Sequence, residues 1–212
     1  MRNQRAGSSV AGKAEMQTRT TSPIWRRFCR NRDGVALVEF AMALPVMLVA
    51  YLGTVEVAQL VMINRKVTQL TSALTDLTAR VQSVAPADLE NIFDAGQTIL
   101  MPYAAGNASM VITSLVIDST GVAKVCWSNQ RNGTALARGT TVTVPDSVKV
   151  ANTSVIMARA SYRYTPAIGY VLTGSFTLGN TPIYSRPRNG LAGGTLNIEQ
   201  VKRTDVGYCP TF

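Results

Sequence analysis

"RDGVALVEFAMALPVMLVAYLG", residues 32–53, sets one glutamate, Glu39, near the start of an otherwise apolar stretch. Residues 35–55 are enough to cross a hydrocarbon layer of about 30 Å as a helix, at 1.5 Å per residue. A lone carboxylate is unfavourable there, and insertion scales put Asp at a helix centre at roughly 2.5–3.5 kcal/mol. The stretch therefore predicts a membrane helix in which Glu39 has a specific use.

The helical pattern continues beyond the apolar stretch. Hydrophobic residues recur at alternating spacings of three and four: Leu60, Ile63, Val67, Leu70, Leu74, Leu77, Val81 and Val84. This period of 3.5 residues is typical of helices that pack side by side. We therefore expect one helix over residues 35–84, about 75 Å long, with the membrane in its first half. Pro45 removes one backbone hydrogen bond and should kink or loosen the helix, and Pro86 should end it or start the next element.

Beyond Pro86 the sequence predicts a small α+β domain, residues 85–212. Residues 87–100 have the pattern of a short amphipathic helix, and strand and turn patterns follow Pro102. The expected strands lie at 109–118 and 122–128, which form a hairpin, and at 140–144 and 154–165. Residues 176–190 are rich in turn residues with short β-like pieces, and the tail at 195–212 should contain a last strand with Cys209 near its end. The fold class expected is therefore a long N-terminal helix followed by a β-rich domain.

The net charge of +9 is concentrated at the N-terminus. Residues 1–34 carry eight Lys or Arg and two acidic residues, and the remaining 178 residues carry 13 basic and 10 acidic residues. The leader lacks the apolar side chains of a core, so we expect disorder over residues 1–22, with translation starting at Met1 or Met16. Its charge favours the cytoplasm under the positive-inside rule. Nucleic-acid binding is not expected, since Lys and Arg do not cluster in the domain.

Histidine is absent, which removes the commonest general base and the commonest transition-metal ligand. No Cys-x-x-Cys pair supports a zinc site, so we expect no catalytic residue, no metal and no cofactor. If the C-terminal region is exported, Cys126 and Cys209 can form one disulfide while Cys29 stays reduced in the cytosol. Two buried free thiols are the alternative.

Residues 34–40, Gly-Val-Ala-Leu-Val-Glu-Phe, carry a specific resemblance. Type IV pilin precursors have a basic leader that ends in Gly, followed by an apolar helix whose fifth mature residue is Glu. Glu39-Phe40 and the residues after them resemble TadE-like minor pilins and pseudopilins of tight-adherence (Flp/Tad) pili, as do residues 160–166 and 185–188. The resemblance implies cleavage between Gly34 and Val35 by a prepilin peptidase. It also implies a single-pass protein of the bacterial inner membrane, with a cytoplasmic N-terminus and a periplasmic C-terminal domain.

The resemblance suggests why Glu39 is tolerated. Cleavage would give Val35 a new α-ammonium group, which can neutralise the Glu39 carboxylate of another subunit when helices stack. Glu39 would then set the register in which the subunit assembles with other Tad pilins and pseudopilins. The resemblance also implies that the subunit contacts membrane lipid and the inner-membrane assembly platform of the pilus. We expect residues 35 to about 73 to pack on neighbours, and burial within the chain beyond about Leu74. Glu56 should lie at the periplasmic interface or in a second contact with a partner pilin.

Other hypotheses remain open at this point. The chain could be an uncleaved periplasmic binding module that uses residues 35–55 only as an anchor, with Glu39 reaching the headgroups. A membrane-tethered hydrolase is disfavoured by the missing histidine. The glycines at 190, 193 and 194 lack the rest of a phosphate-binding loop and predict a flexible surface loop. Arg186 and Arg188 predict a solvated turn or a contact with an acidic partner.

Overall fold

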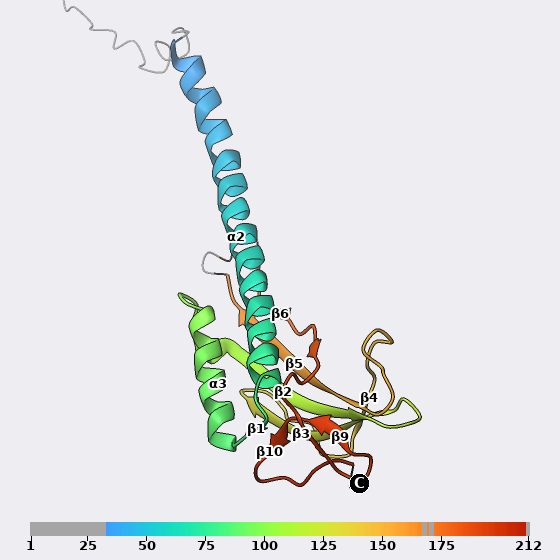
Figure 1. The fold of residues 1–212 in the computed structure, drawn as a ribbon. Coiled ribbons are helices and arrows are strands. Elements are labelled where there is room, and N and C mark those ends of the chain that lie inside the picture. Colours follow the sequence, from blue (N-terminus) through green and yellow to red (C-terminus); the bar gives the residue numbers. More distant parts are fainter. Residues whose placement is uncertain (1–32, 167–168, 170–171, 211–212) are drawn as a thin grey trace, which may run out of the picture. The chain divides into compact units, whose positions relative to one another are not determined.

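The computed structural model describes residues 33–166, 169 and 172–210, and it confirms the α+β class (Figure 1). The chain divides into two compact units, Met1–Leu48 and Val49–Phe212. Most of the cytoplasmic leader predicted at residues 1–34, including Cys29, lies outside the described residues. The helices are α2 (Asp33–Ala79), α3 (Pro86–Ile99) and the short 3-10 helix η1 (Ala105–Asn107). The strands are β1 (Ser83–Val84), β2 (Ala108–Ile117), β3 (Ala123–Arg131), β4 (Thr141–Val142), β5 (Thr153–Tyr164), β6 (Phe176–Gly179), β7 (Ile183–Ser185), β8 (Leu191–Gly193), β9 (Ile198–Gln200) and β10 (Lys202–Arg203).

The long helix α2 ends at Ala79, so the predicted end at Val84 was wrong. The backbone N–H of Arg188 donates to the carbonyl of Ala79 at 2.8 Å, and the side chain of Asn189 donates to the next carbonyl. Strand β1 then pairs in parallel with β10. Long-range hydrogen bonds thus replace the helical ones, and Val84 reaches the core as a strand residue.

Helix α3 begins at Pro86, which starts this element as expected. Proline suits the first helical turn because the N–H that it lacks would have no partner there. The carboxylate of Asp88 accepts a hydrogen bond from the N–H of Ala85 at 2.9 Å, and its charge is favourable at a helix N-terminus. The predicted amphipathic helix at 87–100 is therefore confirmed, shifted by one residue.

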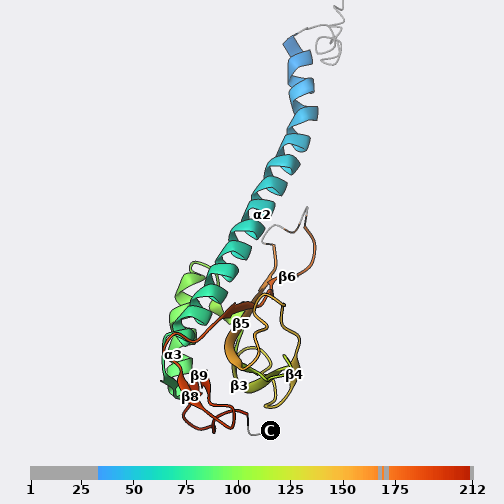
Figure 2. The same cartoon turned by 45° about the vertical axis from the view of Figure 1, so that its right-hand side comes forward.

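The opposite end of α3 is held by α2. The ammonium group of Lys66 donates to the carbonyl oxygens of Ile99 and Met101, at 3.0 and 2.8 Å. These contacts satisfy carbonyl groups that a helix end leaves without partners. Gly96 allows the two helices to approach closely, because a side-chain carbon there would lie 2.7 Å from Cδ1 of Leu70. Within the second unit, α3 accordingly lies along α2 (Figures 1 and 2).

The main sheet has the strand order β4-β3-β2-β5-β6, with β7 also paired to β5. Its antiparallel β2–β3 hairpin is the one predicted from the sequence. In the turn, the carboxylate of Asp118 accepts hydrogen bonds from the hydroxyl of Thr120 at 2.6 Å and from the N–H groups of Thr120 and Val122, both at 2.9 Å. The Thr120 hydroxyl and then the Val122 N–H lower the pKa of Asp118, because they stabilise its charged form.

Each face of the sheet carries its own apolar cluster, because neighbouring strand residues point to opposite faces. On one face, Met110, Ile112 and Ile156 pack with buried residues of α2 and α3. On the other, Leu115, Val125 and Met157 pack against residues of the connection between β3 and β5. The sheet is therefore covered on both sides, and its helical face is the one that meets α2.

The tail is fastened near β9 by a disulfide between Cys126 and Cys209. The side-chain amide of Gln200 donates to the carbonyl of Cys209 at 2.8 Å, and its oxygen accepts from the N–H of Cys209 at 3.1 Å. Gly194 has a φ of +79° and lies so close to Cys209 that a side chain would collide with it. The glycine-rich stretch expected to be a flexible loop instead forms β8 and a close-packed turn.

Candidate functional site

The first described segment, residues 33–48, is entirely helical and carries exposed apolar side chains. Those with large exposed areas include Val35, Leu37, Val38, Phe40, Met42, Val46, Met47 and Leu48. Among the described residues, the helix that starts here is the one that is long and apolar enough to cross a membrane. This segment is therefore compatible with a membrane anchor.

The residues of the predicted processing and assembly site all lie on α2. Gly34 and Val35 are in its first turn, where backbone N–H groups have no partner within a helix. Glu39 and Phe40 follow in the next turn with exposed side chains. The helix is continuous through Pro45. The processing site and the register role of Glu39 stay predictions.

The face of α2 that the domain covers begins earlier than expected. Ile63, Val67 and Leu70 are buried, so the prediction that burial starts near Leu74 was wrong. The reason lies in two glycines far along the chain. Gly179 on β6 packs directly against the Val67 side chain, and Gly96 on α3 packs against Leu70. Both positions let another element approach the helix closely.

The predicted heptad pattern also fails beyond Leu74. Leu77 is 38% exposed, whereas Thr75 and Thr78 are buried. A straight α-helix has 3.6 residues per turn, so a 3.5-residue pattern drifts around it by about 20° per heptad. The threonines can be buried because their hydroxyls donate to the carbonyl four residues earlier, at 2.8 Å in each case.

These findings shorten the part of α2 that the chain's own domain leaves uncovered. Within the second unit, the large apolar side chains that stay exposed on α2 before Ile63 are Val49, Tyr51, Val57, Val61 and Met62. From Ile63 onward, most of the regularly spaced apolar residues belong to the chain's own core, and Leu77 is the exposed exception among them. Apart from the buried Glu56, the part of α2 that the domain leaves uncovered therefore ends at about residue 62, instead of at about 73.

Glu56 is held within the chain, so the expected contact with a partner pilin was wrong, whereas its place at the periplasmic interface stays a prediction. Its side chain is 2% exposed, and its two oxygens accept hydrogen bonds from the backbone N–H groups of Gly169 at 2.9 Å and Leu172 at 3.1 Å. A buried carboxylate is tolerated when such donors replace water. The partners come from the chain's own β5–β6 connection, more than 110 residues away.

A second contact nearby joins β5 to the same part of α2. The hydroxyl of Tyr164 donates to the side-chain oxygen of Gln59 at 2.7 Å. Burial raises the pKa of Tyr164, and the charge of Glu56 raises it further, because both disfavour the phenolate. Tyr162 is also buried, as expected for strand residues two apart, and its ring meets the edge of Tyr103.

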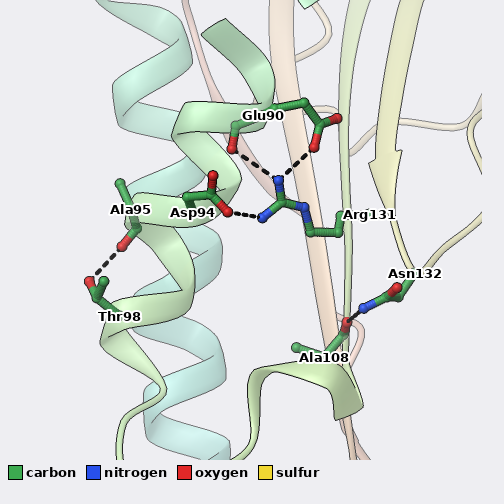
Figure 3. A network of polar contacts seen from close by, with 7 residues as sticks. All are labelled: Glu90, Asp94, Ala95, Thr98, Ala108, Arg131 and Asn132. Carbon is green, nitrogen blue, oxygen red and sulfur yellow. Dashed lines mark hydrogen bonds and ion pairs between the residues drawn. The ribbon is translucent and has the colours of Figure 1, made fainter. Parts of the chain in front are cut away.

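An ionic cluster fastens α3 to the sheet (Figure 3). From the end of β3, Arg131 donates to the Glu90 carboxylate at 2.6 Å and to a carboxylate oxygen of Asp94, and it lies over the Phe93 ring. Burial opposes the charge of Arg131, but the hydrogen bonds to Glu90 and Asp94 outweigh it and raise the Arg131 pKa. No local sequence pattern indicated this cluster, because the arginine and its partners lie about 40 residues apart.

Arg188 also has a partner within the chain, since its guanidinium lies 2.7 Å from the carboxylate of Asp76 on α2. Arg186 is exposed.

Across the described residues, no group of three His, Cys, Asp or Glu side chains is placed to hold a metal ion. Most of the polar contacts described above involve α2 or α3.

Together these features define a class of protein, an α+β domain whose core includes the last part of a long helix that is compatible with membrane anchoring. The model of the TadE-like protein family matches residues 34–74. The chain thus carries a TadE-like segment, which confirms the resemblance over this part of α2 and points to a protein associated with the Tad pilus. No curated protein and no solved structure matches the chain.

Proposed function

We propose that this chain is a minor pilin or pseudopilin that helps to initiate or assemble a Tad-type pilus for surface adhesion. The observation that carries the proposal is the TadE-like match, which begins at Gly34 and covers the exposed apolar part of α2. In this function a prepilin peptidase cuts between Gly34 and Val35. The remaining chain stays in the inner membrane, with its α+β domain in the periplasm, until it joins other Tad pilins.

Glu39 supplies the register in this assembly. After cleavage, the α-ammonium group of Val35 and the Glu39 carboxylate of a neighbouring subunit are opposite charges in hydrocarbon. Each is costly alone, and pairing offsets part of that cost. The exposed position of Glu39 on α2 supports this role, because its carboxylate is available to another chain.

The N-terminus of the membrane-extracted protein tests the proposal first. We expect a chain that starts at Val35 when a prepilin peptidase is co-expressed, and an uncut chain without it. N-terminal sequencing and intact mass measure both. A chain that starts at Met1 or Met16 in both samples contradicts the proposal and supports the uncleaved anchored module.

Glu39→Ala is expected to leave membrane insertion and processing intact but to reduce incorporation with a partner pilin. Glu39→Gln should behave similarly, because it keeps the size and removes the charge, and Glu39→Asp should restore part of the incorporation. Resistance to carbonate extraction measures membrane insertion, N-terminal sequencing measures processing, and co-purification with the partner pilin measures incorporation. Normal incorporation of Glu39→Ala would rule out the register role.

A further inference from the structure

The face of the main sheet opposite α2 changes character along β5. Met157 belongs to the apolar cluster on this face. Arg159, Ser161 and Arg163 follow on the same side, because every second residue of a strand points to the same face. Arg159 and Ser161 are half-buried, and Arg163 is exposed. The apolar face therefore gives way to two arginines with a serine between them.

The neighbouring strands add hydroxyl groups to this part of the face. Ser109 on β2 is the cross-strand neighbour of Ser161, and Thr177 on β6 is that of Arg163. Residues directly opposite each other on adjacent strands have their side chains on the same face. Just after β3, Gly133 lies against Ser109, since a side-chain carbon there would come within 2.7 Å of the serine hydroxyl oxygen. We call the contiguous set the arginine–hydroxyl cluster, and its members are Ser109, Arg159, Ser161, Arg163 and Thr177.

The side chains of this cluster have no hydrogen-bond or ion-pair partner among the described residues. On the opposite face of the sheet, by contrast, Arg131 is paired with Glu90 and Asp94. The Nε atom of Arg159 is buried and unpaired, and a partly buried charge without a counter-charge is unfavourable. The strands β2 to β7 contain no Asp or Glu that could supply a counter-charge. An anion from outside the chain would therefore be stabilised here.

The groups in the cluster favour phosphate among the common anions. A guanidinium group can donate two parallel hydrogen bonds to a phosphate, and each hydroxyl can donate one more. A phosphate monoester has a charge of about −1.5 to −2 at pH 7 and three acceptor oxygens, which matches two arginines. A carboxylate has one negative charge and two oxygens, so it would leave the charge of one arginine uncompensated.

We propose that the arginine–hydroxyl cluster is a binding site for a phosphate group, which is held between Arg159 and Arg163. Residues two apart on a strand are separated by about 7 Å, and two long arginine side chains can converge on one phosphate across that distance. The site lies within the second unit and on the face of the sheet opposite α2. The domain thus has a ligand site of its own, separate from the helix contacts of the proposed function.

The test titrates inorganic phosphate and glycerol phosphate into the full chain in a neutral detergent, followed by calorimetry and phosphorus NMR. The ionic strength is kept constant, because salt screens exposed charges. We expect saturable binding at a single site, and weaker binding of acetate at the same concentration. Tighter binding of glycerol phosphate would assign a phosphate ester as the ligand, and tighter binding of inorganic phosphate would assign the free ion.

Arg159→Ala and Arg163→Ala should each weaken phosphate binding about tenfold or more, because each removes charge-assisted hydrogen bonds. Arg159→Lys should weaken it less than Arg159→Ala, since the charge is kept. Circular dichroism checks the fold of every variant, and the exposed Arg163 can be replaced without loss of packing if Arg159→Ala fails to fold. Arg65→Ala is the matched control: Arg65 is an exposed arginine on α2, across the sheet from the site, so its loss should leave binding unchanged.

The proposal is overturned if the folded chain shows no saturable phosphate binding, or if acetate binds as tightly as phosphate. It is also overturned if Arg65→Ala weakens binding as much as Arg163→Ala, since the effect would then reflect net charge alone. Failure of the pilin function would appear separately, as an unprocessed N-terminus.

Discussion

Replacing Cys126 and Cys209 together with alanine is expected to lower the free energy of unfolding by about 4–5 kcal/mol. The disulfide joins residues 83 positions apart, and a long closed loop removes much entropy from the unfolded chain. Both cysteines are buried, so the bond also holds the tail beside Gln200. Guanidinium unfolding of the detergent-solubilised protein, followed by circular dichroism, measures the change.

Cys29→Ser is the matched control for this variant, because Cys29 lies in the basic leader and should not contribute to the stability of the domain. Alkylation of the unreduced protein under denaturing conditions checks the premise. The wild-type chain should expose one reactive thiol, that of Cys29, when residues 1–34 are present, and none when the proposed cleavage has removed them. Two further reactive thiols would contradict the bond and favour the buried free cysteines.

Leu70→Ala is expected to destabilise the isolated subunit by about 2–5 kcal/mol, the usual cost of removing a buried leucine side chain. Leu70 lies on α2, where its side chain is buried against Gly96 of α3. Its loss leaves a cavity in the chain's own core, so the effect requires no other subunit. Thermal unfolding of the purified chain in detergent measures it.

Val61→Ala is the comparison that makes this result informative. Val61 is 56% exposed on α2, so its truncation should change the stability of the isolated subunit by less than about 0.5 kcal/mol. In the proposed assembly, Val61 lies on the part of α2 that faces neighbouring subunits, so we expect weaker co-purification with a partner pilin. Equal destabilisation by both variants would contradict the boundary placed between Val61 and Ile63.

The local parts of the fold were predictable from the sequence. The apolar run, the helix that starts at Pro86 and the β2–β3 hairpin each follow from spacings within about 20 residues. Glu39 also stood out without a structure, because a charge in an apolar stretch is costly wherever the chain folds. Two cysteines in a region expected to be exported made a disulfide an option, although the sequence could not choose between it and free thiols.

Only the tertiary structure decided which part of α2 the domain covers. Hydrophobic periodicity marks a face that will be buried, but it does not say whether the chain itself or a neighbour covers it. Gly96 and Gly179 settled this for Leu70 and Val67, because they allow other elements to approach the helix.

Local sequence patterns were enough to predict the long apolar helix, the unusual Glu39 and the β2–β3 hairpin, because backbone preferences and side-chain periodicity act over a few turns. The tertiary structure alone decided that α2 ends at Ala79, that Glu56 is held by Gly169 and Leu172, and that Arg131 is paired with α3. Those outcomes depend on polar groups that find partners far along the chain. A local sequence pattern does not predict these long-range contacts, since the partners come together only when the sheet packs on the helices.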